Sequence, residues 1–308
     1  MGRPGFPNSL KEFQTRFRDE AACGKYLAAC PWQDGFRCAR CGKTVAFELH
    51  QRKLWQCKAC AFQTSLTSGT LLHRTRLPLT VWFWAAYLMT THTPGLSFVQ
   101  LQRQLGISYE TAWVLLHRLR RAMVNPERQT LQGKVEVDGT YLGGSEAGLK
   151  GGRQLLKKAL IVGAVEVRGK VAGRMRLQIV PDASALSLTG FIKQVIASGT
   201  VIRSDGWGAY DPLSGMGYKH LPQTQGDRKQ STKLLPHIHR IFSNLKTWLN
   251  GTHHGVGHDH LQSYLDELVF RFNRRRTPMA ASQTVLGLAS AAHRPMSYQM
   301  LYDSESTR

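Results

Sequence analysis

The sequence has few acidic residues for its length. Asp and Glu number 20 among 308 residues, against 41 Lys and Arg, so the formal net charge at pH 7 is +21. The basic excess runs through both halves of the chain, which argues against a disordered basic tail on a neutral domain. A charge of this size and sign favours a polyanionic partner.

Long apolar runs are also missing. The most apolar stretch, residues 79–89 (LTVWFWAAYLM), falls well short of the roughly 20 residues that cross a bilayer. The opening MGRPGFPNSLKEF contains no apolar segment typical of a secretory signal, and the sequence therefore predicts a cytoplasmic protein. No Gly-rich phosphate loop followed by Lys-Ser or Lys-Thr is present, so no nucleotide cofactor is expected.

Cysteine is scarce, but four of the six cysteines form two C-x-x-C pairs. Cys38 and Cys41 are separated from Cys57 and Cys60 by 15 residues, a spacing close to that of structural zinc sites. Four thiolates close a tetrahedral Zn²⁺ site fully, which suits a folding role better than catalysis. We predict a zinc ribbon over residues 37–62 after a helical lead-in over 1–36. Four ordinary reduced cysteines are the alternative.

The helical region 78–124 contains a candidate helix-turn-helix. Two segments with apolar residues at helical spacing flank Gly106, which suits a left-handed turn, and Ser108 can cap the second helix. In a DNA-reading unit the second helix enters the major groove. It would turn Tyr109, Glu110, Trp113 and His117 outward and bring Arg118, Arg120 and Arg121 near phosphates. A purely structural helical hairpin is the alternative.

From Val135 onward the pattern changes to strands, which predicts an α/β catalytic domain over residues 130–285 and a C-terminal tail over 286–308. Two apolar runs end in Asp-Gly, at Asp138 and Asp205. Strands that deliver carboxylates to their ends allow two aspartates to share a divalent cation such as Mg²⁺. An isolated Asp-Gly is otherwise an ordinary turn.

A helix is predicted from Pro236, and two polar residues share one of its edges. His239 and Lys246 are seven residues apart, which is two helical turns. The imidazole is placed to complete a metal site and the ammonium to hold a phosphate; a solvated pair is the alternative. Arg274, Arg275 and Arg276 follow a later helix and are expected to grip a DNA backbone, unless they form a plain solvated face.

In this order the motifs resemble insertion-sequence transposases of the DDE type, and more narrowly the zinc-ribbon group called the IS fifteen-ninety-five family. The matching texts are CARC…CKAC, SGTLLHRTRLPL, VEVDGTYLGG, IRSDGWGAY, HIHRIFSNLKTWLNGTHHGV and HLQSYLDELVFRFNRR. The resemblance implies a ribonuclease-H-like domain and Mg²⁺-dependent cutting and joining of double-stranded DNA at the ends of a bacterial element. It also implies a homo-oligomer, expected to be a dimer on DNA, with Asp138, Asp205, His239 and Lys246 as the catalytic set.

The sequence departs from the DDE pattern at the third acidic position, where His239 stands. A nitrogen ligand is softer than a carboxylate and brings no negative charge, so it shifts the expected preference from Mg²⁺ toward Mn²⁺. Asn244 and Glu267 are the other candidates for the third ligand, although Glu267 can equally pair with Arg271 one turn later. A DNA-binding regulator with a decayed catalytic centre and a structure-selective nuclease stay open as alternative functions.

Overall fold

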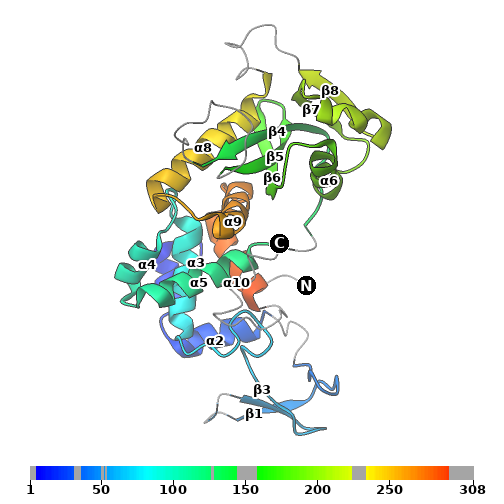
Figure 1. The fold of residues 1–308 in the computed structure, drawn as a ribbon. Helices are drawn as coiled ribbons and strands as arrows, with labels where there is room; N and C mark the ends of the chain where they lie inside the picture. Colours follow the sequence, from blue (N-terminus) through cyan, green and yellow to red (C-terminus); the bar gives the residue numbers. More distant parts are fainter. Residues whose placement is uncertain are drawn as a thin grey trace. The chain divides into compact units, whose positions relative to one another are not determined.

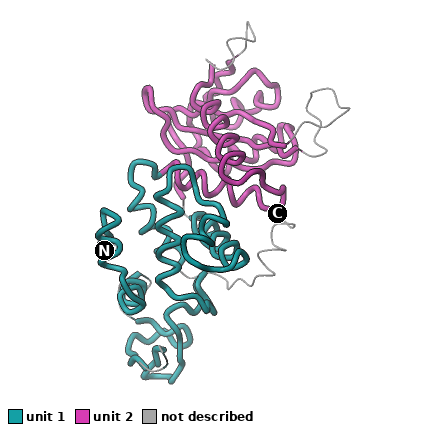
Figure 2. The backbone as a smooth tube through the Cα atoms, turned by 90° about the vertical axis from the view of Figure 1, so that its left-hand side faces the viewer, with its two compact units in different colours: residues 1–125, 274–308 teal, residues 126–273 magenta. Residues whose placement is uncertain are grey.

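The computed structural model describes residues 5–30, 36–49, 52, 54–125, 128–143, 158–223 and 234–290 (Figure 1). The chain forms two compact units, one of residues 1–125 with 274–308 and one of residues 126–273 (Figure 2). The second unit ends at Asn273, inside the range 130–285 that is predicted for the catalytic domain. Residues 291–308, most of the predicted tail, lie outside the described residues. Within the described ranges, no helix is long and apolar enough to cross a membrane.

The first unit is mainly helical. Its helices are α1 (Leu10–Arg16), α2 (Glu20–Ala28), α3 (Leu79–Thr91), α4 (Phe98–Leu105), α5 (Tyr109–Ala122) and α10 (Pro278–Ser290). Helix α10 packs on α3, α5 and α2 and buries Ala281, Val285 and Leu286. This apolar face is the physical reason that the segment after Asn273 belongs with the N-terminal helices rather than with the second unit.

Helices α4 and α5 form the predicted helix-turn-helix. Gly106 ends α4 in the left-handed region at φ 62°, and the Ser108 hydroxyl accepts a hydrogen bond from the Thr111 amide at the start of α5. A left-handed residue without Cβ strain and a polar N-cap are what a tight turn between helices requires. The two helices and the turn are therefore confirmed.

The same unit holds a small three-stranded antiparallel sheet of β1 (Ala46–Leu49), β2 (Leu54–Cys57) and β3 (Gln63–Ser65). Phe36, Cys38 and Cys57 form its buried centre. Such a small sheet cannot bury enough apolar surface to fold alone, so it depends on a cross-link such as a metal.

The second unit is built on a five-stranded mixed sheet. Its strands are β4 (Lys134–Leu142), β5 (Ala159–Arg168), β6 (Val171–Val180), β7 (Val201–Asp205) and β8 (Lys219–Gln223), in the spatial order β6-β5-β4-β7-β8. Strands β4, β5 and β6 pair antiparallel, whereas β7 and β8 run parallel to β4. This is the predicted ribonuclease-H-like arrangement within an α/β domain.

The two faces of β4 carry different residues. Val135 and Val137 face a core completed by α6 (Ala185–Val195), whereas Glu136 and Asp138 face the side that carries α8 (Pro236–His253). Helix α8 runs along β4 and β5 (Figure 1). The alternation of β-strand side chains thus separates the apolar core from the polar site.

Helix α8 approaches the sheet closely because β5 has a glycine beneath it. Gly163 pairs with Asp138 across the strands. A Cβ at this position would lie 2.7 Å from Cδ1 of Ile238 and 3.0 Å from Cε1 of Phe242, both on α8. A side chain at 163 would therefore push the helix away from the strand that carries Asp138.

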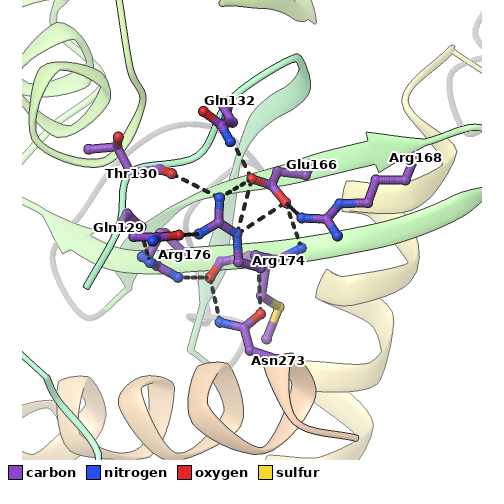
Figure 3. Close-up of polar contacts among 9 residues, drawn as sticks. Gln129, Thr130, Gln132, Glu166, Arg168, Arg174, Arg176 and Asn273 are labelled. Atoms are coloured by element: carbon purple, nitrogen blue, oxygen red, sulfur yellow. Dashed lines mark hydrogen bonds and ion pairs between the residues drawn. The ribbon is translucent and has the colours of Figure 1, made fainter. Parts of the chain in front are cut away.

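Glu166, on β5, is the centre of a charged cluster (Figure 3). It is 2% exposed and accepts hydrogen bonds from Nη2 of Arg168 at 2.7 Å, Nε of Arg174 at 3.1 Å and the amide of Gln132 at 3.2 Å. Burial alone would raise the pKa of Glu166, but these hydrogen bonds outweigh it and lower the pKa to about 2. The carboxylate is therefore a charged, satisfied centre.

The same cluster fixes both ends of this unit. Near its start, the Gln129 carbonyl accepts from Nη2 of Arg176 at 2.7 Å. At its end, the Asn273 side chain accepts from the Met175 amide at 2.8 Å and donates to the Met175 carbonyl (Figure 3). Helix α9 (Leu261–Asn273), which brings Asn273 here, packs on β6.

Candidate active site

Asp138 and Asp205 occupy equivalent positions on neighbouring strands. The parallel register of β4 and β7 pairs Val135 with Ile202 and Glu136 with Arg203, and two residues further along it reaches Asp138 and Asp205. Residues in equivalent positions on adjacent parallel strands project from the same face. The parallel register therefore brings the two carboxylates to one side of the sheet. Asp205 is the last residue of β7, as predicted, whereas Asp138 lies in the middle of β4, because the strand continues to Leu142 by pairing with β5.

His239 joins these carboxylates from α8. Its Nε2 lies 3.1 Å from Oδ2 of Asp138, whose side chain is 17% exposed, and Oδ1 of Asp138 accepts from the Gly139 amide at 2.7 Å. The hydrogen bond to Asp138 raises the pKa of His239, and the charges of Asp138, Glu136 and Asp205 act in the same direction against the opposing effect of burial. All three acids therefore act electrostatically on this imidazole.

Tyr210 is a buried residue near the site, and the charges of both aspartates act on it. It is buried in the core of the second unit, in the turn Gly208–Met216 that follows Asp205. Burial raises the pKa of Tyr210, and the charges of Asp138 and Asp205 raise it further. The phenol therefore stays protonated beside the two carboxylates. Sequence reasoning missed Tyr210, because an aromatic residue in a turn carries no distinct signal.

The donor set suits a hard divalent cation, because it joins two carboxylates that share one face with a neighbouring imidazole. The ligand atoms of this set are spaced more widely than those of a closed metal site. Among the described residues, only the four cysteines form a group of three or more His, Cys, Asp or Glu residues whose ligand atoms all lie within 4.8 Å of one another. In this structure His239 contacts Asp138 directly, and the oxygens of Asp138 and Asp205 are the ligands best suited to Mg²⁺ or Mn²⁺.

The other candidates for the third ligand lie elsewhere. Asn244 is exposed on α8, five residues past His239 and so on another side of the helix. Glu267 is fully buried on α9, against β6, and pairs with Arg271 at 3.4 Å. The structure thus brings His239 to Asp138, whereas Glu267 contacts Arg271 on its own helix. Lys246 is exposed on α8, two turns beyond His239.

The four cysteines of the ribbon converge as a metal centre requires. The Sγ atoms of Cys38 and Cys60 are 3.6 Å apart, as are those of Cys41 and Cys57. Tetrahedral Zn²⁺ with Zn–S bonds near 2.3 Å would space its sulfurs by about 3.8 Å. The predicted spacing of the cysteines therefore corresponds to a preformed structural zinc site.

Two family models match this chain. An ISXO2-like transposase domain of the IS1595 group matches residues 130–273, and a transposase zinc-ribbon domain of the same group matches residues 18–63. Together they cover more than half of the 308 residues. The chain belongs to the zinc-ribbon transposases of the IS1595 family. No curated protein matches it.

Solved structures similar to this IS1595-family transposase are remote. A simian T-cell lymphotropic virus intasome in complex with PP2A regulatory subunit B56 gamma shares 14% identity at a TM-score of 0.29, and the match covers 55% of this chain and 63% of that chain. A pre-cleavage Mos1 transpososome shares 11% identity at a TM-score of 0.26, and the match covers 64% of this chain and 75% of that chain. A Mos1 paired-end complex with the left transposon end shares 11% identity at a TM-score of 0.27, and the match covers 68% of this chain and 80% of that chain.

In α5, the second helix of the helix-turn-helix, two of the side chains that were expected to face DNA are buried. Arg120 is 0% exposed and stacks 5.2 Å over the Phe98 ring, and His117 is buried. The structure therefore buries both side chains, against the expectation that they face outward, and a DNA contact by either of them stays a prediction. The physical reason is that the buried stripe of α5 is wider than its aliphatic residues suggest, since an aromatic ring of α4 covers its edge.

The remaining predicted DNA contacts on α5 are placed unequally. Tyr109 is 48% exposed at the start of the helix, and Arg121 is exposed near its end. Trp113 is partly buried, with its ring 4.3 Å from that of His117. Arg118 donates to the Leu71 carbonyl at 3.4 Å, and burial lowers its pKa. Tyr109 and Arg121 are thus the members of this set best placed for a partner.

The basic run after α9 lies at the start of the segment that returns to the first unit. Arg275 and Arg276 are exposed, whereas Arg274 is partly buried. Burial and the neighbouring charge of Arg276 lower the pKa of Arg275. Two adjacent exposed guanidinium groups are suited to phosphate contacts.

Proposed function

We propose that this chain is a DNA transposase that cuts the ends of a bacterial insertion sequence and joins them to target DNA by metal-dependent phosphoryl transfer. The observation that carries the proposal is the equivalent placement of Asp138 and Asp205 on adjacent strands of a ribonuclease-H-like sheet, with His239 against Asp138. The substrate is double-stranded DNA, which the net charge of +21 favours, and its site of action is the cytoplasm.

The residues divide the chemistry among them. Asp138 and Asp205 would hold Mg²⁺ or Mn²⁺, which when bound activates the attacking oxygen and stabilises the leaving one in an in-line displacement. His239 orients Asp138 through the 3.1 Å contact and completes the set. Lys246 lies about 10 Å further along α8, at 1.5 Å per residue, and would hold a phosphate that flanks the scissile bond.

DNA recognition is assigned to the first unit. The zinc ribbon, Tyr109 and Trp113 of the helix-turn-helix, and the arginines Arg118, Arg121, Arg274, Arg275 and Arg276 would contact the element ends. Exposed arginines contribute most of the non-specific affinity by neutralising phosphates. Because two element ends must be joined to one target, we propose that the working form is a homo-oligomer, a dimer on DNA.

A labelled-end assay tests this function. The purified protein is incubated with candidate end DNA in Mg²⁺ or Mn²⁺, and cut and joined products are scored separately. Asp138→Ala and Asp205→Ala are expected to bind the ends as the parent does but to lose both products. Asp259→Ala, which removes an exposed carboxylate in the turn before α9, is the matched control and should retain both.

The outcomes separate the candidate functions. Cut products without joined products would identify a nuclease with the same core. End binding without metal-dependent cutting in the parent would identify a DNA-binding regulator, and either result would contradict the transposase proposal.

A further inference from the structure

The first turn of α8 is capped by a carboxylate from the sheet. The helix begins after Leu235 without a side-chain cap of its own. Instead, Oε2 of Glu136 on β4 accepts hydrogen bonds from the amides of His237 at 2.9 Å and Ile238 at 3.1 Å. The side chain of Glu136 is 0% exposed. A charged carboxylate at a helix N-terminus satisfies free amides and opposes the helix dipole.

Arg203 holds the chain segment just before the same turn. It is the register partner of Glu136 on β7, and its Nη1 lies 3.6 Å from Oε1 of Glu136. Its Nη2 donates to the Leu234 carbonyl at 2.7 Å and to the Gln223 side chain at 3.3 Å. Glu136 therefore fixes backbone donors at the helix start, and Arg203 fixes a backbone acceptor beside them.

Glu136 and Arg203 each stand two residues before a proposed catalytic aspartate on the same strand. Glu136 and Asp138 are two residues apart on β4, as are Arg203 and Asp205 on β7, so all four project from the same face. Of these residues, Glu136 and Arg203 hold the start of α8, and Asp138 meets His239 in the same first turn of the helix. The contacts of Glu136 and Arg203 therefore fix the start of α8 relative to strands β4 and β7.

A purely stabilising role explains this arrangement poorly. Burying a carboxylate costs several kcal/mol even when it is paired, whereas a Ser, Thr, Asp or Asn at the helix N-cap would satisfy the same amides locally at little cost. The cap that the chain uses comes from the strand of Asp138, about a hundred residues away. A long-range cap fixes where the helix sits, which a local cap does not.

We propose that Glu136 and Arg203 are positioning residues that set the first turn of α8, so that His239 meets Asp138 and Asp205 in the geometry needed to bind the catalytic ion. This inference rests on the proposed function. Neither residue touches the reacting atoms, and each acts through the helix.

Mn²⁺ binding to the full-length, zinc-loaded protein tests the inference without requiring DNA or activity. Electron paramagnetic resonance measures the bound Mn²⁺ in the parent and in Asp138→Ala. The Mn²⁺ that the parent binds and the variant does not is assigned to this site. Glu136→Gln keeps the shape but removes the charge, and is expected to weaken that affinity by about tenfold or more, as for other groups that orient metal ligands. Hydrogen exchange at the His237 and Ile238 amides should accelerate in the same variant.

Glu166→Gln is the matched control, because Glu166 is likewise a buried, hydrogen-bonded carboxylate of this sheet. It should lower the resistance to denaturant while changing the Mn²⁺ affinity less than twofold. If Glu136→Gln does not fold, Arg203→Lys retains a positive charge but loses the forked contact, and should show a smaller loss in the same direction. Affinities of either variant equal to that of the parent, or an equal loss in the control, would overturn the inference.

The two proposals fail in different ways. A parent protein without an Asp138-dependent Mn²⁺ site would contradict the proposed function. A parent with that site, together with unchanged affinity and unchanged amide exchange in Glu136→Gln, would contradict the positioning role alone.

Discussion

Nε2 of His239 lies 3.1 Å from Oδ2 of Asp138, so the residue at the third position of the proposed catalytic set contacts the first. The contact joins helix α8 to strand β4, two elements about a hundred residues apart in the chain. It gives the imidazole a defined orientation that a solvated surface histidine would lack. The side chain at the third position therefore has a defined place beside Asp138, although it is a histidine and not an acidic residue.

Replacing His239 should change the metal preference. His239→Glu restores a third carboxylate, which adds negative charge and a hard oxygen ligand, and we expect the ratio of cleavage rates in Mg²⁺ and Mn²⁺ to shift toward Mg²⁺. His239→Ala should reduce cleavage by roughly 10- to 100-fold at limiting metal. Metal titrations of the initial cleavage rate measure both effects. A Mg²⁺ to Mn²⁺ ratio unchanged in both variants would show that His239 has no part in metal binding.

A side chain at position 163 should displace α8. Gly163→Ala places a methyl group within 3.0 Å of atoms from three buried side chains, and such overpacking costs about 1–3 kcal/mol. Urea unfolding should show this loss, and metal affinity should fall with it because the helix carries His239. Gly190→Ala on α6 is the control, since its added methyl meets nothing within 4 Å and should be neutral or stabilising.

Glu166 should make the second unit acid-sensitive. Its pKa is lowered from 4.5 to about 2, so its contribution to stability is fully present above pH 4.5 and is lost as the pH falls toward 2. A shift of this size corresponds to roughly 3 kcal/mol. The free energy of unfolding of the parent should therefore decline between pH 4.5 and 2 more steeply than that of Glu166→Gln. Parallel curves for the two proteins would contradict the assignment.

Arg120 and Arg121 should separate folding from DNA binding. Arg120 is buried over Phe98, so Arg120→Ala should lower the melting temperature. Arg121 is exposed, so Arg121→Ala should leave the melting temperature unchanged, weaken binding to end DNA and reduce the salt dependence by about one phosphate contact. Fluorescence anisotropy at several salt concentrations measures this. An unchanged affinity and salt slope in Arg121→Ala would remove the residue from the interface.

Removing zinc should unfold the ribbon selectively. Its three short strands surround Cys38, Cys57 and one aromatic residue as their buried centre, which is too little apolar surface to fold without a cross-link. Chelation, or Cys57→Ala, should abolish protection of the ribbon amides from hydrogen exchange while the amides of β4 and β5 stay protected. Retained protection in the ribbon after metal removal would exclude a zinc-dependent fold.

The sequence was sufficient for the parts of the fold that follow from local pattern. The strand that ends at Asp205, the helix from Pro236 and the turn at Gly106 lie where apolar periodicity and special residues predict them. The strand at Asp138 was also predicted, but it continues past Asp-Gly to Leu142. Strand β8 was not predicted, because KHLPQ contains a proline and little apolar character. Its place depends on pairing with β7, which is a tertiary effect.

Long-range features could not be read from local pattern. The return of α10 to the first unit, and with it the domain end at Asn273, depends on packing against helices from the other end of the chain. The burial of Arg120 depends on the Phe98 ring of another helix. The role of Glu136 had a partial signal, since an acid between Val135 and Val137 shares a face with Asp138, but its helix partner is visible only in three dimensions.

The most direct measurement of the central claim is a crystal structure of the full chain with Mn²⁺, with the ion located by its anomalous scattering. The account predicts an anomalous peak bonded to carboxylate oxygens of both Asp138 and Asp205, with His239 beside it. A well-ordered site at saturating Mn²⁺ with no peak there, or with an ion bound to only one of the two aspartates, would contradict it.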